Sequence, residues 1–304
     1  MDPLTHGLVG MALGLQNGGS LSLANGTLVA SVIGSLLPDA DIVFQIRGDY
    51  AYLKQHRGFS HSLPTAVVAA ALTGWVLTFF YPNYGFGGLF AGVLVGFLSH
   101  LFLDLLNSYG VKILWPLSQR KYTLNLLPLF DPFLVLICLL SKQSVFWGLV
   151  GFYLGGRWLL KKWAEKILRT RFFPEKCLFS LNVLPASANP LLWDFILETE
   201  NKFIVGSLHL AKGSCQIFRK LVRVREDLAA IFQKTLLGQL FREFTPFYHF
   251  YVEKEDEKLV CRFMDLRYRV QDRFLHNGTL VMDSQGRVIK EIFQPYSPAH
   301  VISL

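Results

Sequence analysis

Two long apolar runs separated by a short turn constrain the fold of this chain more than any other feature. The first extends from Leu63 to Tyr81 and the second from Phe86 to Leu106. A helix needs about 20 apolar residues to cross the hydrocarbon core of a bilayer, and each run is long enough. The Tyr81–Gly85 segment between them contains proline and glycine and is typical of a turn. We therefore expect an antiparallel helical hairpin whose open ends share one membrane face.

The composition favours the same class of protein. The mean hydropathy is +0.35, 52% of the residues are hydrophobic and only 17% are charged. Soluble domains average about 25% charged residues. Four shorter apolar segments add to the long runs: Leu4 to Leu15, Leu21 to Leu37, Leu126 to Leu140 and Val145 to Leu160. We predict that residues 1–160 form an α-helical integral membrane domain with about four spans and additional short helices.

The rest of the chain has the pattern of a small soluble α+β domain. Residues 161–174 are interpreted as a basic linker, and residues 175–304 contain short alternating runs such as Phe203–Val205. The Asp283–Gly286 segment between two further runs is typical of a hairpin turn. Apolar residues at helical spacing predict one helix from Lys220 to Phe241.

The distribution of Lys and Arg predicts the orientation in the membrane. The loops at the open ends of the hairpin and the segment after Arg157 are rich in Lys and Arg. In the opposite loops the only basic residue is Lys142. By the positive-inside rule the basic face is cytoplasmic. The net charge of +8 then fits anionic lipid headgroups, and the dispersed basic residues predict no nucleic-acid partner. We expect a multi-pass protein of the inner or plasma membrane, in contact with the lipid bilayer, with a cytoplasmic C-terminal domain.

Ionisable residues that are costly to place in a membrane gather near the predicted cytoplasmic edge. His100 and Asp104 have i, i+4 spacing, which places both side chains on one face of a helix. Taken alone, this pair fits a hydrogen bond between helices equally well, but several other His and Asp residues are expected at the same edge. The candidate metal ligands are His6, Asp39, Asp41, His56, His61, His100 and Asp104.

This set of side chains favours a divalent metal site. Imidazole and carboxylate groups without thiolate suit zinc, with manganese or iron as alternatives, and the chain has no Cys-x-x-Cys pair. Seven candidates exceed the roughly four protein ligands of one tetrahedral ion, so one or two ions are expected.

Such ions polarise a phosphoryl or acyl oxygen and lower the pKa of a coordinated water. Asp41 is the candidate general base, and Arg57 is the candidate clamp for a phosphate oxygen. Arg57 also fits a simple membrane anchor under the positive-inside rule. Asp131 is a candidate for a further ligand or a supporting partner.

Four motifs in this order resemble the YdjM-like family of membrane-bound metal-dependent hydrolases. They are Met1-Asp2-Pro3-Leu4-Thr5-His6-Gly7-Leu8-Val9-Gly10, Leu37-Pro38-Asp39-Ala40-Asp41, His56-Arg57-Gly58-Phe59-Ser60-His61-Ser62 and His100-Leu101-Phe102-Leu103-Asp104-Leu105-Leu106-Asn107. The segment from Leu184 to Trp193 is similar to YfhP-type members, which append a cytoplasmic domain. A more distant likeness, through the His-x-x-x-Asp pair, is to helical zinc phospholipases C and nucleases, although their N-terminal Trp ligand has no counterpart here.

The resemblance implies metal-dependent hydrolysis, and the distant likeness implies a phosphoester substrate, with lipids among the candidates. The alternative is a non-enzymatic membrane protein in which a structural metal holds the helices together and the cytoplasmic domain binds a partner. A transporter is less favoured because the middles of the two long runs offer little polarity beyond Thr73.

Overall fold

The computed structural model describes residues 1–16, 18–48, 58–140, 143–172, 178–223, 232, 234–255, 258–270, 273–295 and 300–304. The chain divides into two compact units. Unit 1 comprises residues 1–47, 55–162 and 187–190. Unit 2 comprises residues 48–54, 163–186 and 191–304.

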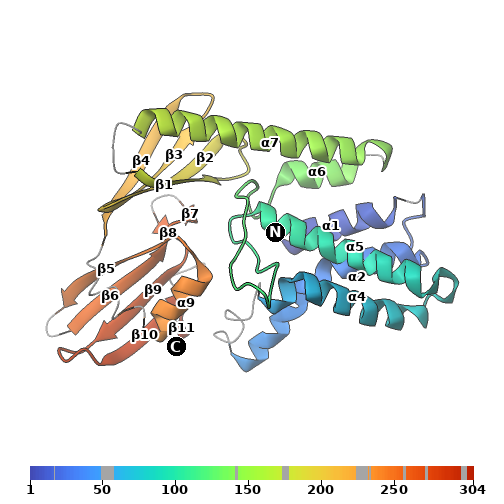
Figure 1. The fold of residues 1–304 in the computed structure, drawn as a ribbon, viewed down its shortest axis with the longest axis horizontal. Helices are drawn as coiled ribbons and strands as arrows, with labels where there is room; N and C mark the ends of the chain where they lie inside the picture. The colour runs from blue at the N-terminus through green and yellow to red at the C-terminus, as the bar shows by residue number, and fades with distance from the viewer. Residues whose placement is uncertain are drawn as a thin grey trace. The chain divides into compact units, whose positions relative to one another are not determined.

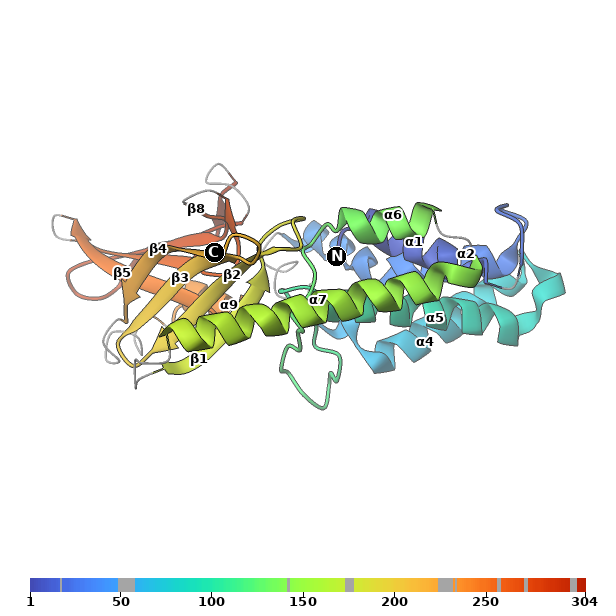
Figure 2. The same ribbon diagram turned by 90° about the horizontal axis from the view of Figure 1, so that it is seen from above.

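Unit 1 is helical. Its elements are α1 (Pro3–Gly14), α2 (Gly26–Leu36), η1 (Leu37–Arg47), η2 (Phe59–His61), α4 (Leu63–Thr78), η3 (Pro82–Tyr84), α5 (Gly85–Leu106), α6 (Pro132–Leu140) and the first part of α7 (Gln143–Phe172). Helix α2 packs against both α1 and α5, and α4 packs against α5, so these four helices lie side by side in Figures 1 and 2. The η3 turn joins α4 to α5 as the antiparallel hairpin that the sequence predicts.

Small residues let these helices approach closely. A Cβ atom added at Gly34 of α2 would lie 2.1 Å from the carbonyl oxygen of Val93 in α5. One added at Gly96 of α5 would lie 2.1 Å from the carbonyl oxygen of Ser31. Glycine at such contacts is a common means of helix association in membranes, where lipid competes for apolar side chains. This close packing brings the ends of α2 and α5 together.

Two helical segments are long and apolar enough to cross a membrane among the described residues, Gly26–Ile46 and Pro82–Leu106. Of the four or so spans that the sequence predicts, two are therefore supported. Helix α4 (Leu63–Thr78) is shorter than a typical span because the helical conformation ends before Tyr81. The apolar segment from Leu126 is helical only from Pro132 onward, where α6 begins.

Unit 2 contains two larger antiparallel sheets. The four-stranded sheet has the order β1-β2-β3-β4, formed by Leu178–Pro185, Leu192–Thr199, Lys202–His209 and Ser214–Val222. The five-stranded sheet has the order β11-β10-β9-β6-β5, formed by Ile302–Ser303, Val288–Gln294, Asn277–Met282, Lys258–Asp265 and Tyr248–Glu255. Strands β7 (Arg269–Val270) and β8 (Arg273–Phe274) pair separately. This arrangement agrees with the predicted α+β domain.

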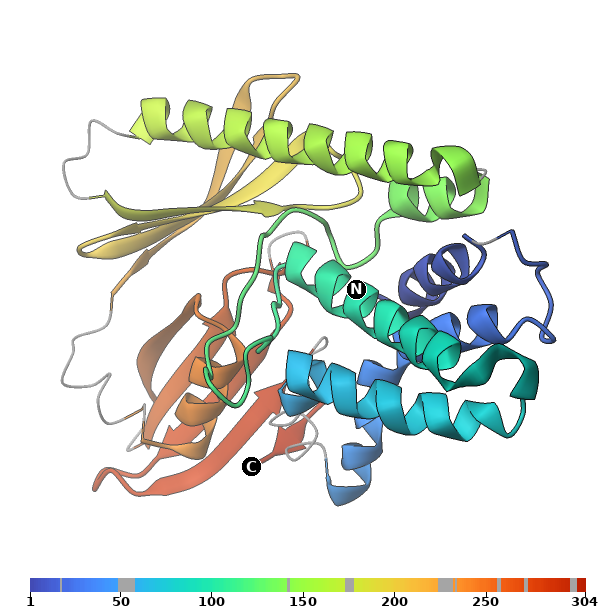
Figure 3. The same cartoon turned by 45° about the vertical axis from the view of Figure 1, so that its right-hand side comes forward.

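Helix α9 (Leu236–Phe244) covers one face of the five-stranded sheet in Figure 3. Its Leu237, Leu240 and Phe241 enter a buried core with Phe263 and Phe293 of that sheet. The predicted helix from Lys220 to Phe241 is wrong at its start, because residues 220–222 complete strand β4. Pairing of these residues with β3 overrides the helical spacing of the apolar side chains.

Unit 2 contains the hairpin that the sequence predicts, but the described part of the predicted linker before it is helical. Strands β9 and β10 pair with Met282 opposite Val288 across the Asp283–Gly286 turn, so the predicted hairpin is present. Gly286 has a φ of +79°, a conformation in which glycine is favoured. Residues 161–172, interpreted from sequence as part of a linker, continue helix α7.

Candidate metal centre

The first turn of α1 positions His6. The Asp2 side chain caps this helix by accepting a hydrogen bond from the Thr5 backbone amide at 2.9 Å, and Pro3 occupies its first turn. His6 is fully buried. The backbone nitrogen of Met1 lies 2.9 Å from His6 Nε2 and also contacts Asp104 Oδ1. The predicted ligand His6 therefore meets the end of α5 inside unit 1.

The C-terminal turns of α5 present His100 and Asp104, both fully buried. Asn107 ends the helix, and its side-chain oxygen accepts hydrogen bonds from the backbone amides of Tyr109 and Gly110 at 2.8 and 3.3 Å. The Asn107 amide also donates to Asp104 Oδ1 at 2.9 Å. The helix end thus fixes the orientation of one predicted carboxylate ligand.

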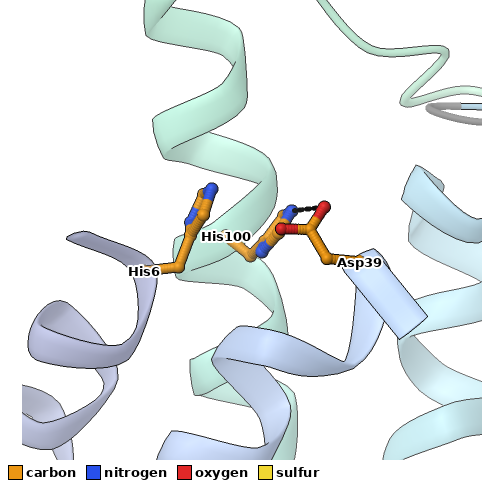
Figure 4. A group of neighbouring side chains, drawn as sticks. All are labelled: His6, Asp39 and His100. Carbon is orange, nitrogen blue, oxygen red and sulfur yellow. Dashed lines mark ion pairs between the residues drawn. The ribbon is translucent and has the colours of Figure 1, made fainter. Parts of the chain in front are cut away.

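Asp39 and His61 come from the short 3-10 helices η1 and η2. Their side chains approach the end of α5: Asp39 Oδ1 is 3.5 Å from His61 Nε2 and 3.6 Å from His100 Nε2. The Asp39 side chain is 24% exposed, whereas His61 and His100 are not exposed. Figure 4 shows His6, His100 and Asp39 converging from three separate elements. We call His6, Asp39, His61, His100 and Asp104 the His/Asp cluster.

Within the cluster, two groups of three residues have ligand atoms that all lie within 4.8 Å of one another. The first group is His6, Asp39 and His100, and the second is His61, His100 and Asp104. His100 belongs to both groups. The imidazole rings of His6 and His100 also stack.

Three donor atoms have mutual spacings suited to one tetrahedral ion, and Asp39 Oδ1 lies near two of them. His61 Nε2 is 3.2 Å from His100 Nε2 and 3.6 Å from Asp104 Oδ2, and His100 Nε2 is 3.7 Å from Asp104 Oδ2. With the two Asp39 distances, five separations fall between 3.2 and 3.7 Å. Ligand bonds of 2.0–2.1 Å place the corners of a tetrahedron about 3.3 Å apart. These five separations are therefore compatible with a tetrahedrally coordinated divalent ion.

Hydrogen bonds fix the ring nitrogen that faces the cluster. His100 Nδ1 lies 2.8 Å from the Ser35 carbonyl oxygen, which can only accept, so Nδ1 carries the proton and Nε2 presents a lone pair. Ser60 Oγ donates to Asp41 Oδ2 at 2.8 Å and lies 2.9 Å from His61 Nδ1. Because the hydroxyl proton is directed to Asp41, Nδ1 of His61 donates, and its Nε2 also faces the cluster.

The charges of this arrangement are compatible with a bound cation, although the Met1 amino group already pairs with Asp104 Oδ1. Two imidazole lone pairs 3.2 Å apart repel each other, and two carboxylates add negative charge beside them. In addition, the buried His6 Nδ1 has no hydrogen-bond partner among the described residues. A divalent ion would satisfy these donors, which are otherwise costly to bury.

The structure separates the predicted ligands into those that gather and those that do not. Asp41 lies 3.6 Å from His61 Nδ1, on the ring edge opposite the cluster, and belongs to neither three-residue group. Asp131 instead caps α6, accepting from the amides of Phe133 and Leu134, and accepts from the Tyr153 hydroxyl at 2.6 Å. The predicted sites His56 and Arg57 lie outside the described residues.

Sequence reasoning missed the supporting roles of Ser35 and Ser60. Ser60 is adjacent to His61 in the chain, but its bridging position depends on the η2 turn and on Asp41 from another element. Ser35 acts through its backbone carbonyl, which leaves no side-chain signal in the sequence. Only the arrangement of α2 beside α5 reveals it.

A helical unit with span-length apolar helices and a buried His/Asp cluster, followed by an antiparallel α/β unit, defines the class of this protein. The YdjM inner membrane protein family matches residues 1–165. The YfhP C-terminal alpha/beta plait domain matches residues 227–301. The chain belongs to the YdjM family and carries the YfhP-type C-terminal domain, as the sequence motifs predict.

Relatives agree with this assignment. The chain is 26% identical over 294 residues to the uncharacterized protein YfhP of Bacillus subtilis (strain 168), covering 90% of this chain and 89% of that protein. It is 32% identical to the inner membrane protein YbcI of Escherichia coli (strain K12), over 39% of this chain and 69% of YbcI. The inner membrane protein YdjM of Escherichia coli (strain K12) is 33% identical over 30% of this chain and 50% of YdjM. No solved structure matches.

Proposed function

We propose that this protein is a metal-dependent hydrolase that acts on a phosphoester at the cytoplasmic face of the inner membrane. The observation that carries the proposal is that His61 Nε2, His100 Nε2 and Asp104 Oδ2 lie 3.2–3.7 Å apart, with Asp39 Oδ1 3.5–3.6 Å from both imidazole nitrogens. When bound there, zinc would supply a Lewis acid and a water of lowered pKa. Manganese, iron and a second ion on the His6 group are alternatives.

In this proposal the residues of the site have different roles. His61, His100 and Asp104 form the buried base of the site, and Asp39 is its partly exposed member. A substrate therefore approaches from the Asp39 side. Asp41 acts through Ser60 on His61, so we now propose it as a positioning residue in addition to its predicted role as base. Arg57 remains the predicted phosphate clamp.

Membership of an inner membrane protein family supports the location, and the two span-length helices agree with it. The excess of Lys and Arg on one predicted face supports a multi-pass topology with a cytoplasmic C-terminal domain. The phosphoester substrate rests on the distant likeness to zinc phospholipases C and nucleases through the His-x-x-x-Asp pair, and on the ability of a metal ion to polarise a phosphoryl oxygen.

Metal analysis and hydrolysis assays test this proposal on the full-length protein in detergent. We expect the purified protein to contain stoichiometric zinc and to hydrolyse bis-p-nitrophenyl phosphate or a phospholipid. Asp104→Asn and His61→Gln remove cluster donors and should reduce both metal content and turnover at least tenfold. His209→Gln, in β3 of unit 2, is the matched control and should change neither. Wild-type metal content in both cluster variants contradicts the metal centre.

Complete burial of three donors favours one alternative, a structural metal in a non-enzymatic protein whose C-terminal domain binds a partner. His61, His100 and Asp104 have no exposed side-chain surface, as in closed structural sites. This alternative predicts that metal removal lowers the unfolding temperature while the metal-loaded protein shows no turnover on any phosphoester. Turnover that is lost with the metal and restored by zinc supports the hydrolase instead.

A further inference from the structure

An apolar groove lies beside the His/Asp cluster in unit 1, between α1, α5, α6 and α7. Its volume is about 280 Å³. Helix α5 contributes a continuous stripe to the groove, at Val95, Leu98, Ser99, Phe102 and Leu103. At a rise of about 1.5 Å per residue, this stripe is about 12 Å long. The groove is thus narrow and elongated along the helices.

One end of the groove is lined by residues that lie next to cluster residues along their helices. On α1 the lining residue Val9 lies one turn after His6, on the same face of the helix. On α5 the lining residue Leu103 directly precedes Asp104. From this end the groove runs away from the cluster, toward Leu13 on α1 and Val95 on α5.

The lining is almost entirely apolar. Ser99 has the only hydroxyl among the lining residues, and it donates to the Gly96 carbonyl at 2.7 Å, while the indole N–H of Trp147 is the other polar group. The groove is open at the surface, since Val95 is 45% and Phe102 48% exposed. In an inner membrane protein such a surface faces lipid. The occupant is therefore a hydrocarbon segment that enters from the bilayer.

The size of the groove selects the kind of occupant. A helix of a partner protein is about 10 Å across and occupies on the order of 900 Å³ over a 12 Å length, so the groove would hold only part of its surface. The groove volume is close to the lower limit of small-ligand pockets, about 300 Å³, which suits one unbranched chain.

We propose that this groove binds one acyl chain of a phospholipid and directs its phosphoester to the His/Asp cluster. The placement of the headgroup rests on the proposed hydrolase function, whereas binding of the chain does not. The substrate class is then a membrane phospholipid, held by its chain in the groove and by its phosphate at the partly exposed Asp39 side.

Photolabelling tests the binding of the chain without reference to activity. The full-length protein is placed in vesicles of phosphatidylethanolamine and phosphatidylglycerol that contain a phosphatidylglycerol with a diazirine in the middle of one acyl chain. After irradiation, mass spectrometry maps the labels. We expect labelling of Leu13 and Leu154 to exceed that of the exposed α4 residue Leu72 at least fivefold per residue. Equal labelling overturns the proposal.

Two substitutions at neighbouring positions of α7 give a groove variant and its matched control. Val150 lines the groove, whereas Leu149 is 42% exposed and does not line it. Val150→Trp should lower groove labelling at least fivefold, and Leu149→Trp should leave it unchanged. Each variant's thermal unfolding is measured, and Val95→Phe replaces Val150→Trp if that variant does not fold. Equal labelling of the folded groove variant and Leu149→Trp overturns the proposal.

Release of the phospholipid headgroup from the same vesicles is measured in parallel. Groove-specific labelling without headgroup release rejects the hydrolase and leaves the acyl-chain site standing. Headgroup release with labelling that Val150→Trp does not change rejects the groove and leaves the hydrolase standing. His100→Gln should retain groove labelling, because His100 does not line the groove.

Discussion

The imidazole rings of His6 and His100 stack with their centroids 3.6 Å apart and their planes 12° from parallel. This contact joins the first turn of α1 to the end of α5. Because His100 belongs to both three-residue groups and faces the cluster only through Nε2, it can ligate an ion of one group or of the other.

The shared position of His100 leads to an unequal effect of the two histidines on metal content. His6→Gln removes a ligand from the first group only, so we expect an ion held by His61, His100 and Asp104 to remain bound. His100→Gln removes a ligand from both groups and should reduce bound zinc at least tenfold. Mass spectrometry of the purified variants measures the stoichiometry. Equal losses in the two variants would contradict the shared role.

Ser60 should control metal affinity without contacting the metal. Its hydroxyl connects His61 Nδ1 to Asp41, so Ser60→Ala removes the group that orients this ring. Loss of such a supporting partner typically weakens metal binding about 10- to 100-fold. Competition with a fluorescent zinc chelator measures the affinity. Thr78→Ala, at an exposed hydroxyl of α4, should have no effect, and an equal effect of the two variants would reject the orienting role.

The glycine contacts between α2 and α5 should determine whether unit 1 folds. Gly96→Ala places a Cβ atom against the Ser31 carbonyl oxygen, which belongs to the backbone and cannot easily move. Overpacking of this kind costs about 1–3 kcal/mol. Gly151→Ala, in α7 where a Cβ meets nothing within 4 Å, is the control. Thermal unfolding in detergent, followed by circular dichroism, should show a lower midpoint only for Gly96→Ala.

Two buried histidines make the stability of unit 2 depend on pH. Burial lowers the pKa of His249 and of His276 to about 4. The unfolded chain, with a histidine pKa of about 6.5, then binds more protons than the folded unit between about pH 4 and 6.5. The free energy of unfolding therefore falls as the pH drops through this window. Each histidine contributes up to about 3 kcal/mol.

Asp194 acts in the opposite direction, because burial raises the pKa of its carboxyl to about 6. Its folded form binds the extra proton between about pH 4 and 6, which offsets part of the loss. Hydrogen exchange of strands β6 and β9 in the full-length protein, corrected for intrinsic rates, measures the balance. We expect less protection at pH 5 than at pH 7, and a smaller difference in His276→Gln. Equal protection at both pH values would show that the histidines do not destabilise the unit.

The sequence predicts much of the fold because its strongest signals are local. The apolar runs and the Pro82–Gly85 turn predict the α4–α5 hairpin, and the Asp283–Gly286 turn predicts the β9–β10 hairpin. The error at Lys220 arose where strand pairing, which is a non-local interaction, competed with helical spacing. The number of membrane crossings depends on where helices such as α4 end, and apolar composition alone does not define that end.

The sequence by itself determined the residue types of the candidate site. Ionisable side chains are costly to place in a membrane, so those that lie next to apolar runs can be recognised directly in the sequence. It also determined that His100 and Asp104 share one helix face, since that follows from the helical repeat. Only the tertiary structure decided that Asp39 and His61 meet this pair while Asp41 lies behind His61. The reason is physical: these distances depend on how closely α2 approaches α5 through glycine, and that approach brings together residues far apart in the chain.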